Sequence, residues 1–157
     1  MKDVEKQIQD YILKGVIIFD HGRENILKNE LLAKNSGVRI SEKLQLVVAD
    51  IAELIVQKNQ PKHHLRISSI VRGVGPSHHS TGRAVDIGNE NIAPIIMPEI
   101  ALPKKVSSLS IDEIIIDAGL FGYKNRNIWN FDKGSPHIYD ARTLNYHRNH
   151  IHIAVLK

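Results

Sequence analysis

The chain has 157 residues, of which 42% are hydrophobic and 24% charged, and a formal net charge of +4. This composition is typical of a soluble globular protein, and no apolar run approaches the ~18 residues that span a bilayer. The chain contains no cysteine, which excludes disulfides, a thiolate nucleophile and any metal site with cysteine ligands. A transition-metal site would therefore have to use His, Asp and Glu side chains.

Three helices are predicted in the first 60 residues. Apolar residues follow helical spacing within residues 3–14, and a second short helix is expected at about residues 23–34. The clearest helix begins after Ser41, a residue type that commonly caps helix N-termini. Its apolar positions form one stripe that is predicted to face the core: Leu44, Val47, Val48, Ile51, Leu54 and Ile55.

After residue 61 the pattern indicates strands. Alternation within residues 65–72 places Leu65, Ile67, Ser69 and Val71 on one face, and Arg66, Ser68, Ile70 and Arg72 on the other. A second short strand, "RAVDIG", directs Ala84 and Asp86 to the same side. The chain ends in a third strand, "HIHIAVL".

Between these strands the sequence predicts a loop and a helix. Residues 89–106 contain three prolines and little polar periodicity, which favours a long loop. Ser110 and Glu113 have the spacing of a capping box, which predicts a helix that ends at Gly119. We therefore expect a single α+β domain over residues 1–157, with a helical part (1–60) and a sheet-containing part (61–157). The sheet is expected to be small and antiparallel, to carry the metal site and to pack against the N-terminal helices.

Two histidine clusters suggest a metal site. His150 and His152 are two residues apart on the predicted final strand, so their side chains share one face. The stretch "SHHSTGRAVD" places His79 seven residues before Asp86. His79, Asp86 and one of the C-terminal histidines would supply the three protein ligands of a catalytic zinc site. The pattern alone leaves open that these are ordinary surface histidines, or that they hold another divalent metal.

The same stretch resembles a known signature. "SHHSTGRAVDI" fits the Ser-x-His-x-x-Gly-x-Ala-x-Asp motif of the superfamily that contains lysostaphin-type peptidases, D-Ala-D-Ala metallopeptidases and the hedgehog N-terminal domain. The matching positions are Ser77, His79, Gly82, Ala84 and Asp86. The resemblance covers residues 65–88 and 144–154. It implies that His79, Asp86 and His152 bind Zn²⁺, whereas His78 is expected to point away from the metal.

The resemblance also implies catalytic residues. The first histidine of a final His-x-His acts in catalysis in the lysostaphin and murein endopeptidase branches, which makes His150 the candidate here. His147 matches another histidine of the murein endopeptidase branch. Arg72 corresponds to the arginine of the Ser-Gly-Tyr-Arg stretch in D-Ala-D-Ala peptidases and would bind the substrate or the developing oxyanion, although Ile70 and Val71 replace the Gly-Tyr.

One departure from the family affects the expected base. D-Ala-D-Ala carboxypeptidases have an acid shortly before the last zinc ligand, whereas this chain has Asn149 there and no acid closer along that segment than Asp140. The base is therefore expected to be a histidine, as in the endopeptidase-like branch.

The function implied by the resemblance is that of a zinc-dependent peptidase that cleaves a peptide bond in bacterial peptidoglycan. The partner would be a stem peptide or cross-link, cut by an endopeptidase or D,D-carboxypeptidase activity. Alternatives are a non-catalytic zinc-binding domain of the hedgehog type and a metal-dependent nuclease. The nuclease is disfavoured because the sequence has no recognisable phosphate-binding cluster or aromatic stacking platform, so no nucleic-acid partner is expected.

The expected site of action follows from the N-terminus. No secretory signal is visible there, so synthesis in the cytoplasm is expected, with action on the cell wall or periplasm after release, injection or export. The chain could be part of a larger phage or secretion assembly.

Overall fold

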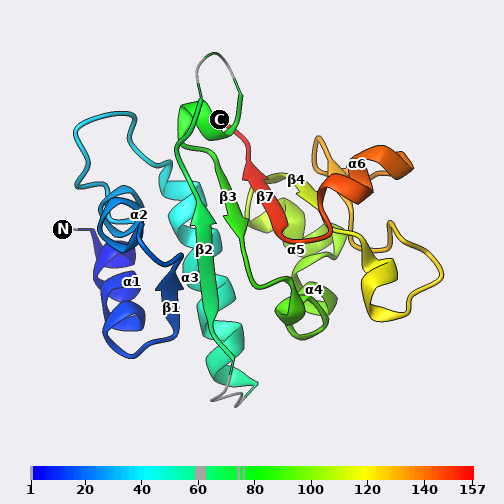
Figure 1. The fold of residues 1–157 in the computed structure, drawn as a ribbon, viewed down its shortest axis with the longest axis horizontal. Coiled ribbons are helices and arrows are strands. Elements are labelled where there is room, and N and C mark those ends of the chain that lie inside the picture. The colour runs from blue at the N-terminus through cyan, green and yellow to red at the C-terminus, as the bar shows by residue number, and fades with distance from the viewer. Residues whose placement is uncertain (1, 59–62, 74, 76) are drawn as a thin grey trace.

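A computed structural model describes residues 2–58, 63–73, 75 and 77–157 (Figure 1). The predicted boundary between residues 60 and 61 lies outside this part of the chain. The described residues form six α-helices: α1 (Asp3–Leu13), α2 (Glu24–Leu31), α3 (Glu42–Gln57), α4 (Ala93–Ile100), α5 (Pro103–Ser108) and α6 (Ala141–Tyr146). They also form seven strands: β1 (Ile17–Phe19), β2 (Leu65–Ser69), β3 (Ala84–Ile87), β4 (Ile111–Ile115), β5 (Phe131–Asp132), β6 (Ser135–Pro136) and β7 (Ile151–Val155).

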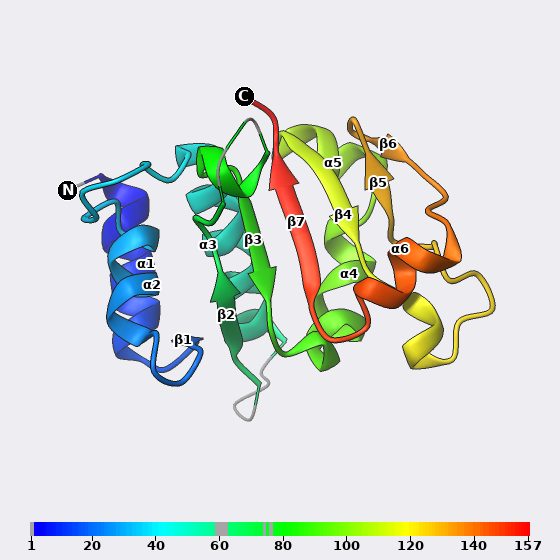
Figure 2. The ribbon, with the colours of Figure 1, turned by 45° about the horizontal axis from the view of Figure 1, so that its top comes forward.

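The strands form one open sheet in the order β1-β2-β3-β7-β4-β5-β6. β1 pairs with β2 in parallel, and every other pair is antiparallel. The predicted α+β class is confirmed. The C-terminal strand β7 lies between β3 and β4, so the last strand of the chain is at the centre of the sheet (Figure 2).

Helices α3, α4 and α5 lie against one face of the sheet (Figure 2). The apolar residues of β3 and β7 that face them belong to the hydrophobic core: Val85, Ile87, Ile151, Ile153 and Val155. The alternate residues of the same strands point to the opposite face, which α3, α4 and α5 do not cover. Within the described residues, none of the helices combines the length and apolar character that crossing a bilayer would need.

The predicted loop at residues 89–106 is wrong, because this segment contains α4 and α5. Pro94 and Pro103 occupy first-turn positions of the two helices, where a missing N–H costs nothing. The buried apolar residues Ile96, Met97 and Ile100 turn α4 toward the core. The prolines therefore mark helix starts here, although Pro98 lies inside α4.

The helix predicted from the capping-box spacing of Ser110 and Glu113 is also wrong. Residues Ile111–Ile115 form strand β4, because they pair with β7 on one side and with β5 on the other. Ser110 has a φ of 56° instead of a capping conformation. A short 3₁₀ helix, Ala118–Phe121, follows the strand.

Two other boundaries differ. β2 ends at Ser69, and the next residue, Ile70, is fully buried instead of facing away with Arg66 and Ser68. β1, the β5–β6 hairpin and α6 have no counterpart in the sequence-based prediction.

Candidate metal centre

Asp86 and His152 occupy directly opposed positions on β3 and β7. The neighbouring residues on both strands are buried in the core, so alternation directs the carboxylate and the imidazole to the other face of the sheet. Side chains directly opposite in an antiparallel pair lie close together. The strand pairing alone therefore brings together two predicted ligands that are 66 residues apart in sequence.

His79 reaches the same place from a turn that precedes β3. The turn is a 3₁₀ helix, His79–Thr81, and the Ser77 hydroxyl accepts a hydrogen bond from the backbone N–H of Ser80 at 3.1 Å. Gly82 ends the turn with a φ of 71°, a conformation that favours glycine. A Cβ at this position would also clash with the carbonyl oxygen of Arg39. The serine and glycine of the signature thus shape the turn that orients His79.

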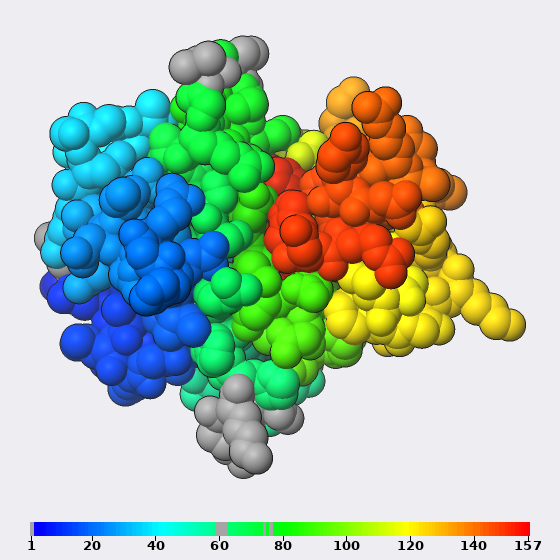
Figure 3. Space-filling model, viewed as in Figure 1, coloured from blue at the N-terminus to red at the C-terminus, as the bar shows by residue number. Residues whose placement is uncertain are grey.

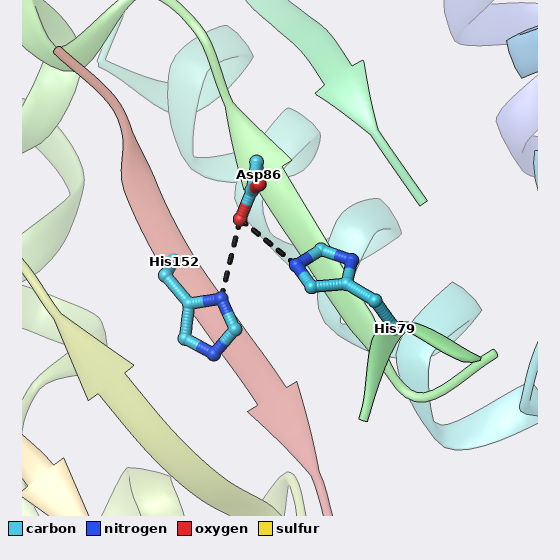
Figure 4. A group of neighbouring side chains, drawn as sticks. All are labelled: His79, Asp86 and His152. Atoms are coloured by element: carbon cyan, nitrogen blue, oxygen red, sulfur yellow. Dashed lines mark hydrogen bonds and ion pairs between the residues drawn. The ribbon is translucent and has the colours of Figure 1, made fainter. Parts of the chain in front are cut away.

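The three predicted ligands meet in the structure (Figure 4). Nε2 of His79 and Nδ1 of His152 each lie 3.2 Å from Oδ1 of Asp86. All three candidate ligand atoms lie within 4.8 Å of one another, and all three residues are buried. The group is therefore compact enough to hold one metal ion, and its two nitrogens and one oxygen are suitable donors for zinc and for other divalent metals.

Hydrogen bonds on the far side of each ring determine which nitrogen faces the centre. Nδ1 of His79 lies 2.8 Å from the carbonyl oxygen of Ile70, and because a carbonyl only accepts, this nitrogen carries the proton. Nε2 of His152 lies 2.6 Å from Oε1 of Glu113, to which it donates in the same way. With a metal bound, both rings would be neutral and their inner nitrogens would present lone pairs to the ion beside the Asp86 carboxylate. Three acceptors that converge in a buried space fit a bound cation.

The pKa values of Asp86 and His152 are shifted because these buried side chains lie so close together. Burial alone would raise the pKa of Asp86, but hydrogen bonds with His152 and His79 hold its pKa far below the usual range. Burial alone would lower the pKa of His152, but its bonds to Asp86 and Glu113 raise it to about 9. Without a metal, a proton on His152 supplies positive charge that a divalent cation would otherwise bring.

Glu113 is the residue near the centre that sequence reasoning missed. The capping-box spacing predicts a helix at this position, whereas β4 places Glu113 beside β7, with its carboxylate hydrogen-bonded to His152. Burial raises its pKa, but the hydrogen bond from His152 more than compensates and lowers the pKa below the ordinary value. An acid therefore does lie beside the last predicted ligand, although it comes from a neighbouring strand and not from the segment before His152.

His78 lies near Glu113 and its neighbour Asp112, and it is not one of the three candidate ligands. Its Nε2 lies 2.7 Å from Oδ2 of Asp112, and its Nδ1 lies 3.8 Å from Oε1 of Glu113. His78 therefore lies near the Glu113 oxygen that bonds His152, and the expectation that it points away from a metal stays a prediction. Asp112 and Glu113 are adjacent residues that engage different histidines, which makes them a useful pair for mutagenesis.

His150 and His147 lie next to the group. Nε2 of His150 is 4.0 Å from Oδ1 of Asp86, while its Nδ1 is 2.8 Å from Oδ1 of Asn149. Nδ1 of His147 is 2.7 Å from the carbonyl oxygen of Thr143, and its ring centroid lies 4.9 Å from that of His150. Burial lowers the pKa of both histidines. Both rings are therefore neutral near pH 7 and each keeps one nitrogen free of these bonds to accept a proton.

A cavity of about 510 Å³ opens beside the group. It is lined by Asp20, Arg23, Arg66, Ser68, Ser69, Arg72, Asp86, Gly88, Tyr146, Asn149 and His150. On the face seen in Figure 3, it lies between the N-terminal segment near α2 (blue) and the C-terminal segment that carries His150 (red). His150 lines the cavity and His147 does not, which makes His150 the better placed of the two to meet a ligand.

The Arg72 guanidinium forms an ion pair with Asp86, so it is not a free substrate-binding group. Its Nη1 lies 3.0 Å from Oδ2 of Asp86, the oxygen that faces away from the two histidines. The side chain is nevertheless 56% exposed and lines the cavity. Arg72 is therefore paired with a predicted ligand and still reaches the space that a substrate would occupy.

Comparison of the chain with models of protein families, with curated proteins and with solved structures finds no match. The geometry of the site and the motif are therefore the grounds for a functional assignment.

Proposed function

We propose that the protein is a zinc-dependent peptidase that cleaves a peptide bond in the stem peptide or cross-link of bacterial peptidoglycan. One observation carries the proposal. Three buried candidate ligand atoms lie within 4.8 Å of one another, next to a neutral histidine that lines an open cavity. The signature shared with peptidoglycan metallopeptidases supports the substrate class.

The donor set fits Zn²⁺, which when bound lowers the pKa of a water molecule and polarises a carbonyl group as a Lewis acid. His79, Asp86 and His152 would hold the ion. Asp86 keeps its second oxygen on Arg72, so the carboxylate is oriented from both sides. Glu113 and the Ile70 carbonyl orient the two imidazoles by accepting their outer protons.

His150 is the proposed general base. Asn149 accepts the proton on Nδ1, which leaves the Nε2 lone pair free and directed toward the ligand group. The lowered pKa of His150 keeps the ring neutral near pH 7, as a base requires. His147 packs against His150 and would support its orientation. Arg72 would donate to the oxygen that develops negative charge when the carbonyl is attacked.

A non-catalytic zinc-binding domain of the hedgehog type is the second candidate. A site that only binds zinc needs no base, so a neutral histidine 4.0 Å from Asp86 on the cavity wall favours the enzyme. The two functions make opposite predictions for His150→Ala. In an enzyme this change abolishes cleavage and spares metal binding, whereas in a structural site it has no catalytic consequence.

The test is digestion of purified peptidoglycan. The zinc-loaded wild type, chelated wild type and zinc-loaded His150→Ala are incubated with walls of several peptide chemotypes, and the fragments are separated and weighed by mass spectrometry. We expect new amine ends with the loaded wild type but not with the chelated wild type or the loaded His150→Ala, and one zinc per chain in both loaded proteins. His21→Ala, which removes a fully exposed histidine, is the matched control and should cleave like the wild type. If the loaded wild type releases no amine ends from any chemotype, the peptidase assignment is wrong.

A further inference from the structure

The cavity beside the metal group carries more positive charge than the proposed chemistry uses. Three arginines and two aspartates line it, and a divalent cation on Asp86 would add to the positive excess. Arg72 is engaged with Asp86 at 3.0 Å, so it belongs to the metal group. Arg23 and Arg66 lie on the same cavity but have no role in the proposed reaction.

Arg66 is held in place by three features. Its Nη1 donates to Oδ1 of Asp20 at 2.6 Å, and its Nη2 donates to the carbonyl oxygen of Gly88 at 2.8 Å. A Cβ on Gly88 would lie 3.1 Å from the guanidinium carbon of Arg66, so the glycine leaves room for the guanidinium against the backbone. The Arg66 guanidinium therefore has a fixed position on the cavity wall, with further N–H donors that these bonds do not use.

Arg23 approaches from the N-terminal part of the chain, immediately before α2. Its Nη1 donates to the carbonyl oxygen of Ser68 at 3.1 Å. Within residues 2–58, 63–73, 75 and 77–157, its side chain makes no other hydrogen bond and no ion pair. Ser68 and Arg66 are alternate residues of β2, so their side chains share the face of the strand that lines the cavity. The two guanidinium groups thus reach one wall from two separate elements.

We propose that Arg23 and Arg66 form a subsite for a free carboxylate of the substrate peptide, at a distance from the bond that is cleaved. This inference rests on the proposed peptidase function and specifies its substrate. Guanidinium groups bind carboxylates through paired, charge-assisted hydrogen bonds, and here one of the two is already oriented by Asp20 and Gly88.

The sheet register gives the distance between this subsite and the metal group. Arg66 lies opposite Gly88, because the backbone N–H of Gly88 donates to the carbonyl oxygen of Arg66, and Gly88 follows Asp86 by two residues. At ~3.3 Å per residue, the subsite lies roughly 7 Å along the strand from the metal group. An extended substrate covers that distance in about two residues. The substrate class is therefore an acidic stem peptide that carries a free, non-amidated carboxylate about two residues from the cleaved bond.

The test measures binding separately from cleavage. Pairs of stem peptides are prepared that differ at one position, a free carboxylate or its carboxamide. Their binding to the chelated, metal-free protein is measured by isothermal titration calorimetry for the wild type, Arg23→Gln and Arg66→Gln. Lys104→Gln removes one positive charge from an exposed position outside the cavity and is the control. Urea unfolding of each variant verifies that it is folded.

For one position of the carboxylate, we expect the wild type to bind the free acid about 10-fold or more tightly than the carboxamide. Arg23→Gln should lose most of this preference, and Lys104→Gln should keep it. The inference is overturned if no peptide pair shows a preference, if the preference survives in both arginine variants, or if a short oligonucleotide binds more tightly than the acid with the same dependence on Arg23. Because binding is measured without metal, failure of the subsite is distinguished from failure of the peptidase, which is judged by amine-end release with the zinc-loaded protein.

Discussion

The contact between Glu113 and His152 makes the sharpest prediction about the metal centre. Oε1 of Glu113 accepts a hydrogen bond from Nε2 of His152 at 2.6 Å, which leaves Nδ1 of the same ring facing the other ligands. Glu113→Gln keeps an oxygen that can accept this bond but removes the negative charge. Glu113→Ala removes both, so the ring loses its orientation as well as the carboxylate that makes it more basic.

The expected magnitudes follow from these contacts. Loss of an outer partner of a metal-bound histidine typically costs 10- to 100-fold in metal affinity. We expect Glu113→Gln to weaken Zn²⁺ binding by roughly 10-fold and Glu113→Ala by up to ~100-fold, equivalent to about 1.4 and 2.7 kcal/mol. Asp112→Asn is the matched control, because Asp112 is the adjacent acid but bonds to His78. It removes the same charge and should change zinc affinity much less than Glu113→Gln, because the Asp112 carboxylate contacts His78 and none of the three predicted ligands.

The assay is competition for Zn²⁺ between each protein and a chromophoric chelator of known affinity, with urea unfolding to verify that each variant is folded. Two results would refute the reasoning. One is a Glu113→Ala protein that binds zinc as tightly as the wild type. The other is an Asp112→Asn protein that is impaired as strongly as Glu113→Gln, since the effect would then be a general loss of negative charge.

Three further changes test the structure around the centre. Interactions in the folded metal-free protein raise the pKa of His152 from 6.5 to about 9, so its protonation stabilises the fold fully below pH 6.5 and this contribution is lost as the pH rises through 9. Urea unfolding in the presence of chelator should show that the free energy of unfolding decreases by up to ~3 kcal/mol across this range. A free energy of unfolding that does not change with pH would contradict this prediction. Gly82→Ala should destabilise the protein by about 2 kcal/mol or more, because alanine meets both a positive φ and the carbonyl of Arg39; an unchanged melting temperature would count against the turn geometry. Asp117→Asn should cost ~1–3 kcal/mol, because the fully buried Asp117 carboxylate accepts from Arg126 at 2.8 Å and from Arg148 at 3.1 Å. Equal stability of the variant would show that these charge-assisted contacts are not needed.

Strong local periodicity made part of the fold predictable. The apolar stripe after Ser41 and the alternation in "RAVDIG" and "HIHIAVL" correspond to α3, β3 and β7. These elements carry their own signal because one face of each is buried in the core. The strand period also predicted that His150 and His152 share a face, but it did not select the ligands: the choice of His79, Asp86 and His152 came from the resemblance to the metallopeptidase signature.

The rest depended on tertiary pairing. Residues 111–115 fit a helix by local spacing, but pairing with β7 and β5 outweighs the capping signal of Ser110 and Glu113. As a result the role of Glu113 could not be anticipated, because its neighbour His152 belongs to a strand 39 residues away. Only the observation that β4 lies beside β7 identifies the contact. The cavity likewise depends on tertiary structure, because Arg23 and His150 come from distant segments of the chain and no local pattern predicts that they line the same space.

The strand pairing also determines what metal binding would do to the whole fold. Asp86 and His152 are directly opposed on β3 and β7, the pair at the sheet centre, and the chain between them contains α4, α5, β4 and α6. An ion bound by both residues would act as a cross-link across this loop, and its binding free energy would add to the free energy of folding. Without the ion, the protonated His152 compensates part of the buried negative charge of Asp86, and this compensation weakens as the pH rises. Removal of the metal should therefore loosen the central strands together, with an effect on global stability that is largest at alkaline pH.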